Sequence, residues 1–355
     1  MEKMVLVHRA PSGKSFLRDL TKPELEVLLT SWKVPRFRAD QILLWIYKKN
    51  ARAFDEMRNL SRELVNLLKE RTELNRLELV SKQESSNRES IKFLTKTPDG
   101  HFCETVLIAQ SGRNTVCVST QLGCRIRCIF CASGKGKFGR NLSAGEIAEQ
   151  VSIVASEIKQ PVTNIVFMGM GEPLDNYDNT MKAIRILQAD WGFKMGSRRI
   201  TVSTSGITPK IKEFVKETGG RVRLSISLHS SDDKTRSYLV PINKKFGLAE
   251  LTKTLDFVHK SLKRDITFEY TLIESVNDSR EEAERTAKLA SRLGAKVNLI
   301  PYNPIREMEF KTPSKTRVEE FKNLLQKKGV RVTVRQTAGR DIDAACGQLR
   351  LDRIS

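Results

Sequence analysis

Apolar residues recur at helical spacing in the amino-terminal part of the chain, from about residue 17 to residue 79. Thr21 followed by Pro23 is typical of a helix start, with the threonine as N-cap and the proline in the first turn. Further apolar stripes at 37–47 and 60–74 indicate two more helices. The pattern therefore predicts a small helical domain.

After this domain the pattern changes to short strand-like runs, first at 91–94 and 102–108. From Thr115 onward, strand-like and helical segments alternate. Ser143 and Glu146 form a capping box, which predicts that a helix begins there and runs to about residue 158. The strands predicted in this region cover residues 115–121, 164–168, 199–204, 221–228, 266–272, 296–300 and 331–335.

Alternating strands and helices are typical of a parallel sheet. Six such units suit a partial (β/α)6 barrel that is open on one side, and a doubly wound sheet is the alternative. Barrels carry their chemistry on the loops after the carboxyl ends of the strands. We predict three segments: a helical accessory domain at 1–90, the barrel at 91–337 and a C-terminal tail at 338–355.

The chain is strongly basic, since 62 lysines and arginines against 42 acidic residues give a net charge of +20. This excess favours a polyanionic partner, nucleic acid first and an anionic membrane surface second, over a merely solvated surface. The helical domain is then either an RNA-binding accessory domain or a packing cap on the barrel. No long apolar run and no apolar amino-terminal segment appears, so we expect a cytoplasmic protein without membrane association.

Three cysteines lie close together after the strand predicted at 115–121. Cys124, Cys128 and Cys131 have C-x3-C-x2-C spacing, and three thiolates can hold a [4Fe–4S] cube while one iron stays open to a small molecule. A structural zinc site needs four ligands, and no histidine lies nearby. A buried thiol cluster, or a ferredoxin-type cluster with Cys117 as fourth ligand, would also be compatible with the cysteine count. The spacing favours a cluster with an open iron.

Small and polar residues follow several predicted strands. Gly171 allows close approach of a ligand to the backbone, and the Glu172 carboxylate can accept hydrogen bonds from an ammonium group. A lone pair of glycines is more often a tight turn, and the third glycine of a dinucleotide fingerprint is missing. The shared position at strand ends nevertheless indicates a ligand site. The candidates that follow later strands are Ser203, Ser227, Leu228, His229 and Asn303.

Three further cysteines lie outside the triplet. Cys346 has small neighbours near the C-terminus, where a thiol is accessible and can act as a nucleophile. Cys103 and Cys117 fall on predicted strands, which favours small buried apolar side chains without a chemical role. Spacing alone therefore assigns a reactive role to Cys346 only.

Taken together, these segments resemble the radical S-adenosylmethionine (SAM) RNA methyltransferases of the RlmN/Cfr type, over nearly the whole chain. Departures are small: Ser133 replaces a more usual threonine, and the turn at 109–111 lacks a more usual proline and acid. The segments that carry the resemblance are 104–108, 117–142, 168–173, 200–206, 227–229, 241–243, 298–304 and 341–349.

The resemblance implies roles for the cysteines. Cys346 takes a methyl group from one SAM, and a second SAM at the cluster supplies a radical that removes a hydrogen from this methyl. Cys117 then attacks the sulfur of Cys346, which forms a transient disulfide and releases the methylated base. Glu104 matches the proposed proton acceptor. The resemblance assigns the [4Fe–4S] cluster to Cys124, Cys128 and Cys131, and SAM contacts to Gly171, Glu172, Ser203, Ser227, Leu228, His229 and Asn303.

The resemblance also implies a substrate. It is carbon 2 of an adenosine in 23S ribosomal RNA, at the peptidyl transferase centre, and in transfer RNA. Pro173 after Glu172 matches the carbon-2 branch of the family. A carbon-8 adenosine methyltransferase of the Cfr type is the alternative, and an iron–sulfur protein that binds RNA or carries electrons comes after it. We expect a monomer that uses two SAM molecules per turnover and a reducing electron donor of the flavodoxin or ferredoxin type.

Overall fold

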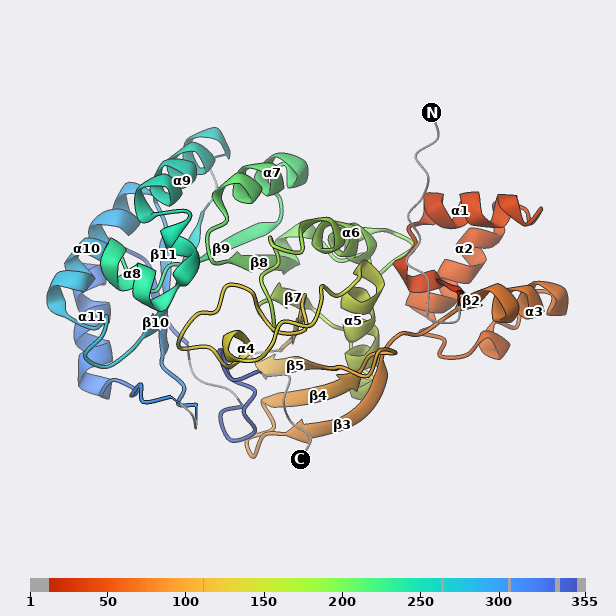
Figure 1. Ribbon diagram of the computed structural model, residues 1–355, viewed down its shortest axis with the longest axis horizontal. Coiled ribbons are helices and arrows are strands. Elements are labelled where there is room, and N and C mark those ends of the chain that lie inside the picture. The colour runs from red at the N-terminus through yellow and green to blue at the C-terminus, as the bar shows by residue number, and fades with distance from the viewer. Residues whose placement is uncertain (1–12, 111, 263–264, 306–307, 336–338, 350–355) are drawn as a thin grey trace.

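The structure, a computed structural model, describes residues 13–110, 112–262, 265–305, 308–335 and 339–349. Figure 1 shows a helical part on one side of the molecule and an α/β part on the other. The amino-terminal segment without an apolar run and residues 350–355 of the predicted tail lie outside the described residues. None of the helices in these ranges is long and apolar enough to cross a membrane.

The helical part contains α1 (Lys22–Ser31), α2 (Arg38–Leu43) and α3 (Arg62–Arg71), as the apolar spacing predicted. α1 begins at the predicted cap, where the Thr21 N–H donates to Glu24 Oε2 at 2.7 Å. α2 continues into one π-helical stretch, η2 (Leu44–Lys48), and two 3-10 turns, η1 (Leu17–Asp19) and η3 (Phe54–Glu56), flank the helices. The short strands β1 (Ser15–Phe16) and β2 (Thr72–Glu73) pair in parallel and join both ends of this part.

Ten strands form one sheet, in the order β12-β11-β10-β9-β8-β7-β6-β5-β4-β3. Among the described strands, β12 and β3 at the two edges are not paired with each other. The sheet is therefore a partial barrel, as predicted. The parallel strands are β6 (Arg113–Cys117), β7 (Asn164–Phe167), β8 (Ile200–Thr204), β9 (Arg223–Ser227), β10 (Thr267–Leu272), β11 (Lys296–Pro301) and β12 (Val332–Val334).

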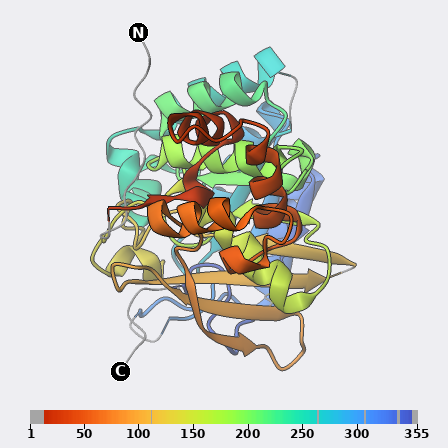
Figure 2. The same ribbon diagram turned by 90° about the vertical axis from the view of Figure 1, so that its right-hand side faces the viewer.

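Three antiparallel strands extend this barrel sheet. They are β3 (Glu78–Glu84), β4 (Ser90–Lys96) and β5 (Phe102–Gln110), and β5 pairs with β6. Figure 2, viewed from the helical side, shows these strands below the helical part. β3 falls inside the segment predicted to be helical, because both of its faces are largely exposed and its charged sequence lacks apolar alternation. The three-segment division of the chain remains a prediction.

Helices connect the parallel strands and lie on the outside of the barrel (Figure 1). Apolar side chains between helices and sheet, such as Ile147, Val202 and Phe268, form one core with Leu25 and Leu68 of the helical part. The long connecting helices are α5 (Ala144–Ile158), α6 (Tyr177–Gln188), α7 (Thr208–Thr218), α9 (Leu248–Leu262), α10 (Arg280–Arg292) and α11 (Lys315–Lys327). Short elements in the loops are α4 (Ala132–Lys135), η4 (Ser197–Arg199), α8 (Asp233–Leu239) and η5 (Pro241–Lys244).

Buried charges join the helical part to α5. The Arg18 and Glu149 side chains are both fully buried, with Nε and Oε1 3.8 Å apart, and Arg76 Nη1 lies 3.0 Å from Asp19 Oδ2. The Gly145 N–H donates to Asp19 Oδ1 at 2.8 Å, and a Cβ at Gly145 would lie only 2.5 Å from this oxygen. These five residues, called the junction below, fix the helical part against the barrel.

Candidate active site

The carboxyl ends of the parallel strands surround a cavity that gathers most of the predicted site residues. All three triplet cysteines, Cys124, Cys128 and Cys131, line this cavity. So does Cys346, which lies more than two hundred residues further along the chain. The tail thiol and the cysteine triplet are therefore neighbours in space. The predicted ligand contacts that also line this cavity are Gly171, Glu172, Ser203, Ser227 and His229.

A second hollow adjoins the first and shares Cys131 and Cys346 with it. Its lining includes Cys117 at the end of β6 and Asn303 after β11. Burial raises the pKa of the Cys117 thiol to about 12. The structure thus brings Cys117 and Cys346 to one hollow, although strand position alone assigned Cys117 a packing role. Cys103, by contrast, faces the main core, as predicted.

The tail reaches this position through hydrogen bonds to the cluster loop, residues 124–135. The Ala132 N–H donates to the Gly347 carbonyl at 2.8 Å, and the Ser133 hydroxyl donates to the Leu349 carbonyl at 2.6 Å. Asn303 Nδ2 donates to the Cys346 carbonyl at 3.1 Å. Ser133, which replaces the more usual threonine, keeps the hydroxyl that makes this contact.

The cysteine triplet lies against an apolar cluster that includes Ile126, Phe130 and Tyr302. Burial is the main cause that raises the pKa of Cys124, Cys128 and Cys131 above the usual thiol range. Bound iron would compensate the charge of three thiolates at such a site. Among the described residues, no three His, Cys, Asp or Glu side chains converge on a single ion. This spacing fits a cube better than mononuclear zinc, because each thiolate of a cube binds a different iron.

Glu172 is buried at the cavity wall and held by backbone and hydroxyl donors. Its Oε2 accepts from the Ser205 N–H at 2.7 Å and from the Ser205 hydroxyl at 2.8 Å. Burial raises the pKa of the Glu172 carboxyl, and these donors oppose the rise. Gly171 has φ +98°, and a Cβ there would lie 2.5 Å from Gln121 Cβ, so only glycine fits before this carboxylate.

His229 is buried beside the triplet, in edge-to-face contact with the Phe130 ring. Burial lowers its pKa to about 3, so the ring is neutral at physiological pH. Nδ1 accepts from the Thr271 N–H at 3.0 Å, which leaves the ring proton on Nε2. His229 is therefore a fixed neutral donor at the cavity.

The remaining predicted contacts differ in what they offer to a ligand. Ser203 and Ser227 hydroxyls lie 3.3 Å apart at the ends of neighbouring strands. Asn303 Oδ1 is buried and has no hydrogen-bond partner in the structure, so it can accept from a ligand. The Leu228 side chain lies in the main core instead, and its N–H donates to the Glu269 carbonyl. A cofactor contact for Leu228 stays a prediction.

Glu104 lies on β5, on the strand face that Val106 shares with the second hollow. Its Oε1 is 3.2 Å from Lys92 Nζ, and both side chains are almost fully buried. Glu104 is thus on the face of the sheet that borders the second hollow, but its carboxylate is already paired with the Lys92 cation.

Three charged residues of the site escaped sequence analysis. Arg236 of α8 donates to the Ser205 and Leu228 carbonyls at 2.6 and 3.1 Å, which fixes two strand-end loops. Arg335 follows β12 and lines both hollows, and Glu269 of β10 lines the first. Single charged residues in strand or helix patterns carry no spacing signal. Arg335 fell at the end of the strand predicted at 331–335, whereas β12 ends at Val334 and leaves Arg335 at the strand end, where the site lies.

Two family models match the chain. The Radical SAM superfamily model matches residues 118–290, and the ribosomal RNA large subunit methyltransferase N-terminal domain model matches residues 16–74. The first covers the cysteine triplet and most parallel strands, and the second covers the helical part.

Known proteins match nearly the whole chain. A relative from Pelotomaculum thermopropionicum is 43% identical over 94% of this chain and 91% of its own length, and one from Thermotoga petrophila is 43% identical over 95% and 98%. Both carry the name dual-specificity RNA methyltransferase RlmN. The crystal structure of a radical SAM methyltransferase from Sphaerobacter thermophilus superposes with a TM-score of 0.91, at 44% identity, over 94% of this chain and 98% of that one. A SAM cofactor and a [4Fe–4S] cluster follow from the superfamily, and the chain belongs to the RlmN family of radical SAM RNA methyltransferases.

Proposed function

We propose that this chain methylates carbon 2 of an adenosine in 23S ribosomal RNA and in transfer RNA, with Cys346 as the methyl carrier. The observation that carries the proposal is the shared cavity of Cys346 and the cysteine triplet, with Cys117 in the adjoining hollow. A simple electron carrier has no need of a thiol held beside its cluster.

The triplet would hold the [4Fe–4S] cluster, which together with SAM supplies a one-electron route to break a carbon–hydrogen bond. Glu172 and neutral His229 in the first cavity, and the unpaired Asn303 oxygen in the adjoining hollow, would bind and orient SAM. Cavity walls made by the apolar cluster would exclude water from the reacting atoms.

The Cys346 sulfur would accept the methyl group by displacement at the methyl carbon of one SAM, and this methyl would then be joined to the adenine ring. Cys117 would resolve this adduct through a disulfide with Cys346, and Glu104 would take the proton that leaves the ring. Glu104 must be ionised to accept a proton, and the neighbouring Lys92 cation favours the ionised carboxylate.

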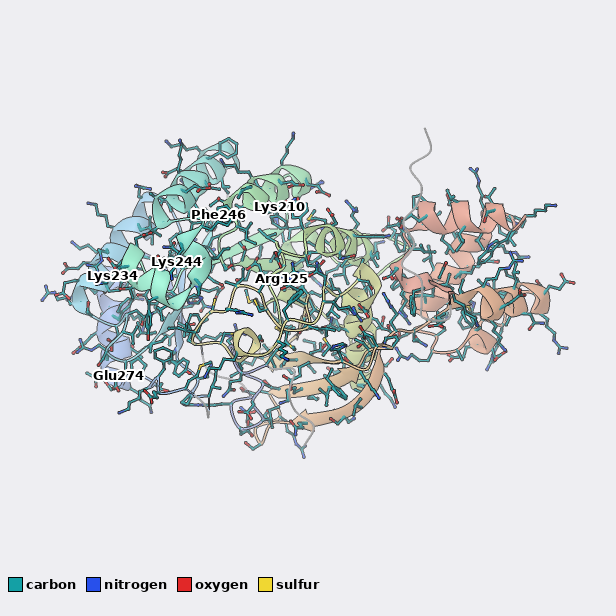
Figure 3. The ribbon with its side chains drawn as sticks, viewed as in Figure 1. Arg125, Lys210, Lys234, Lys244, Phe246 and Glu274 are labelled. Carbon is teal, nitrogen blue, oxygen red and sulfur yellow. The ribbon has the colours of Figure 1, made fainter. Side chains whose placement is uncertain are left out.

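Exposed basic side chains support an RNA substrate. Arg125 of the cluster loop, with Lys234 and Lys244, lies on the face of the molecule seen in Figure 3. The Arg125 guanidinium is 4.0 Å from the centre of the Phe138 ring, which holds it beside the triplet. Phosphate groups of an RNA strand at this face would meet several cations at once.

Product analysis tests the proposal. The cluster-loaded enzyme, SAM and a one-electron reductant are incubated with a 23S RNA fragment or with transfer RNA. We expect 2-methyladenosine in the digests of both RNAs; 8-methyladenosine would place the chain in the carbon-8 branch, and absence of any methylated adenosine would contradict the proposal.

Cys117→Ala should leave the enzyme covalently attached to RNA, and free methylated RNA at the wild-type rate would exclude the resolving role.

A further inference from the structure

Arg335 stands at the point where the two hollows of the site meet. It follows β12 directly, and its N–H donates to the Leu299 carbonyl at 2.8 Å, which ties it to β11. Its side chain is partly buried and lines both hollows, as Cys346 does. A guanidinium in this place faces the reacting groups, and sequence motifs give it no assigned role.

The groups that act on the Arg335 guanidinium are the Cys346 thiol, the Glu269 carboxylate and the Cys117 thiol. The pKa of Arg335 is raised, and the largest cause is Cys346, through its charge and a hydrogen bond to its sulfur. Glu269 and Cys117 raise this pKa further, whereas burial lowers it. The cation therefore interacts with the sulfurs of both cysteines and with one carboxylate.

Glu269 is fixed from the opposite side by the barrel itself. Its Oε2 accepts from Asn298 Nδ2 at 2.7 Å, and Asn298 Oδ1 accepts from the Thr333 hydroxyl at 3.0 Å. Side chains of β10, β11 and β12 thus form a row that ends at Arg335. This row fixes the carboxylate that lies beside the guanidinium.

Opposite charges that lie near each other inside a protein add little to stability, because loss of hydration offsets much of the attraction. Charged groups held in a cavity beside nucleophiles are instead a common sign of a functional site. Arg335 is a cation that lowers the pKa of Cys117 against the effect of burial, and it lines both hollows together with Cys346. Arg335 is the group placed to stabilise negative charge on these sulfurs.

We propose that Arg335 is a positioning residue for Cys346: the guanidinium, held beside Glu269, orients the sulfur and stabilises its negative charge when it acts as a nucleophile. The inference rests on the proposed role of Cys346 as methyl acceptor. In that step the sulfur forms a bond to the methyl carbon, the bond from that carbon to the SAM sulfonium breaks with its electron pair on the leaving sulfur, and the thiol proton goes to solvent.

Alkylation by iodoacetamide tests the role apart from methyl transfer. The Cys346 sulfur displaces iodide from this probe, and trypsin releases residues 341–350 as a peptide whose only cysteine is Cys346. The cluster-loaded wild type is compared with Arg335→Met, Arg335→Gln and Arg335→Lys. Arg223→Met serves as a matched control, since Arg223 is an exposed arginine at the start of β9.

We expect the Met and Gln variants to alkylate Cys346 at least about tenfold more slowly, because they lack the cation that shares both hollows with the attacking sulfur. Lys should restore part of the rate, and the control should match wild type. If Arg335→Met does not fold, the alkylation rate of Arg335→Gln tests the proposal instead. Unchanged alkylation in the neutral variants, or a Lys variant as slow as they are, would overturn the proposal.

The same peptide separates this proposal from the proposed function. Its mass with and without SAM reports whether Cys346 is methylated in wild type. A wild type that never gains the methyl group refutes the carrier role of Cys346, whereas the effect of Arg335 on alkylation is measured independently of that outcome.

Discussion

Two arginines, Arg18 at the junction and Arg335 at the active site, lie inside the protein and differ in what surrounds them. Arg18 donates to the Ser152 hydroxyl at 3.1 Å and to the Ala51 carbonyl at 3.3 Å, and burial is the main cause that lowers its pKa. Arg335 lines a cavity, and the neighbouring Cys346 thiol is the main cause that raises its pKa. A structural arginine is enclosed by fixed partners, whereas a functional one faces groups that change charge during a reaction.

The largest effect should come from the active-site side of this comparison. Cys124→Ala removes one of the three cysteines proposed to hold the cluster, and we expect loss of the iron–sulfur absorption and of SAM cleavage, with little change in unfolding by denaturant. Iron content and 5′-deoxyadenosine formation measure this. Cys103→Ala is the control, because Cys103 faces the main core; a Cys124→Ala protein that still cleaves SAM would remove Cys124 from the ligand set.

A change at the junction should lower stability and leave the cluster content unchanged. Glu149→Ala leaves the buried Arg18 cation without its carboxylate, which should lower the free energy of unfolding by about 3–5 kcal/mol. Denaturant unfolding measures the loss, and cluster content per folded molecule should stay unchanged. Glu157→Ala, which breaks the exposed pair with Lys82, should cost about 0–1 kcal/mol. Equal losses in both variants would mean that the junction is not a structural charge cluster.

The smallest effect concerns pH. Since burial lowers the pKa of His229 to about 3, the folded protein keeps this ring neutral where the unfolded chain binds a proton, between about pH 6.5 and pH 3. Stability should therefore fall as pH falls through this window, by at most about 1.4 kcal/mol per pH unit from this group. The difference between wild type and His229→Asn in unfolding free energy, measured from pH 7 to pH 5, should shrink accordingly. A constant difference would contradict the neutral, buried ring.

The sequence predicted the positions of the parallel strands and the cysteine triplet because both follow from local spacing. The parallel strands fall close to their predicted positions, and Thr21 and Ser143 start helices as expected. β3 was missed because an exposed edge strand lacks alternation. The junction and the Arg335 row were not predictable, since Asn298, Glu269 and Arg335 meet only after distant strands pair.

The attachment of the tail to the cluster loop couples the position of Cys346 to the conformation of the loop that carries the cysteine triplet. Hydrogen bonds from Ala132 and Ser133 hold the last described turn of the chain. Under the proposed function, damage that loosens this loop, such as oxygen attack on a bound cluster, would also release the Cys346 sulfur from its position.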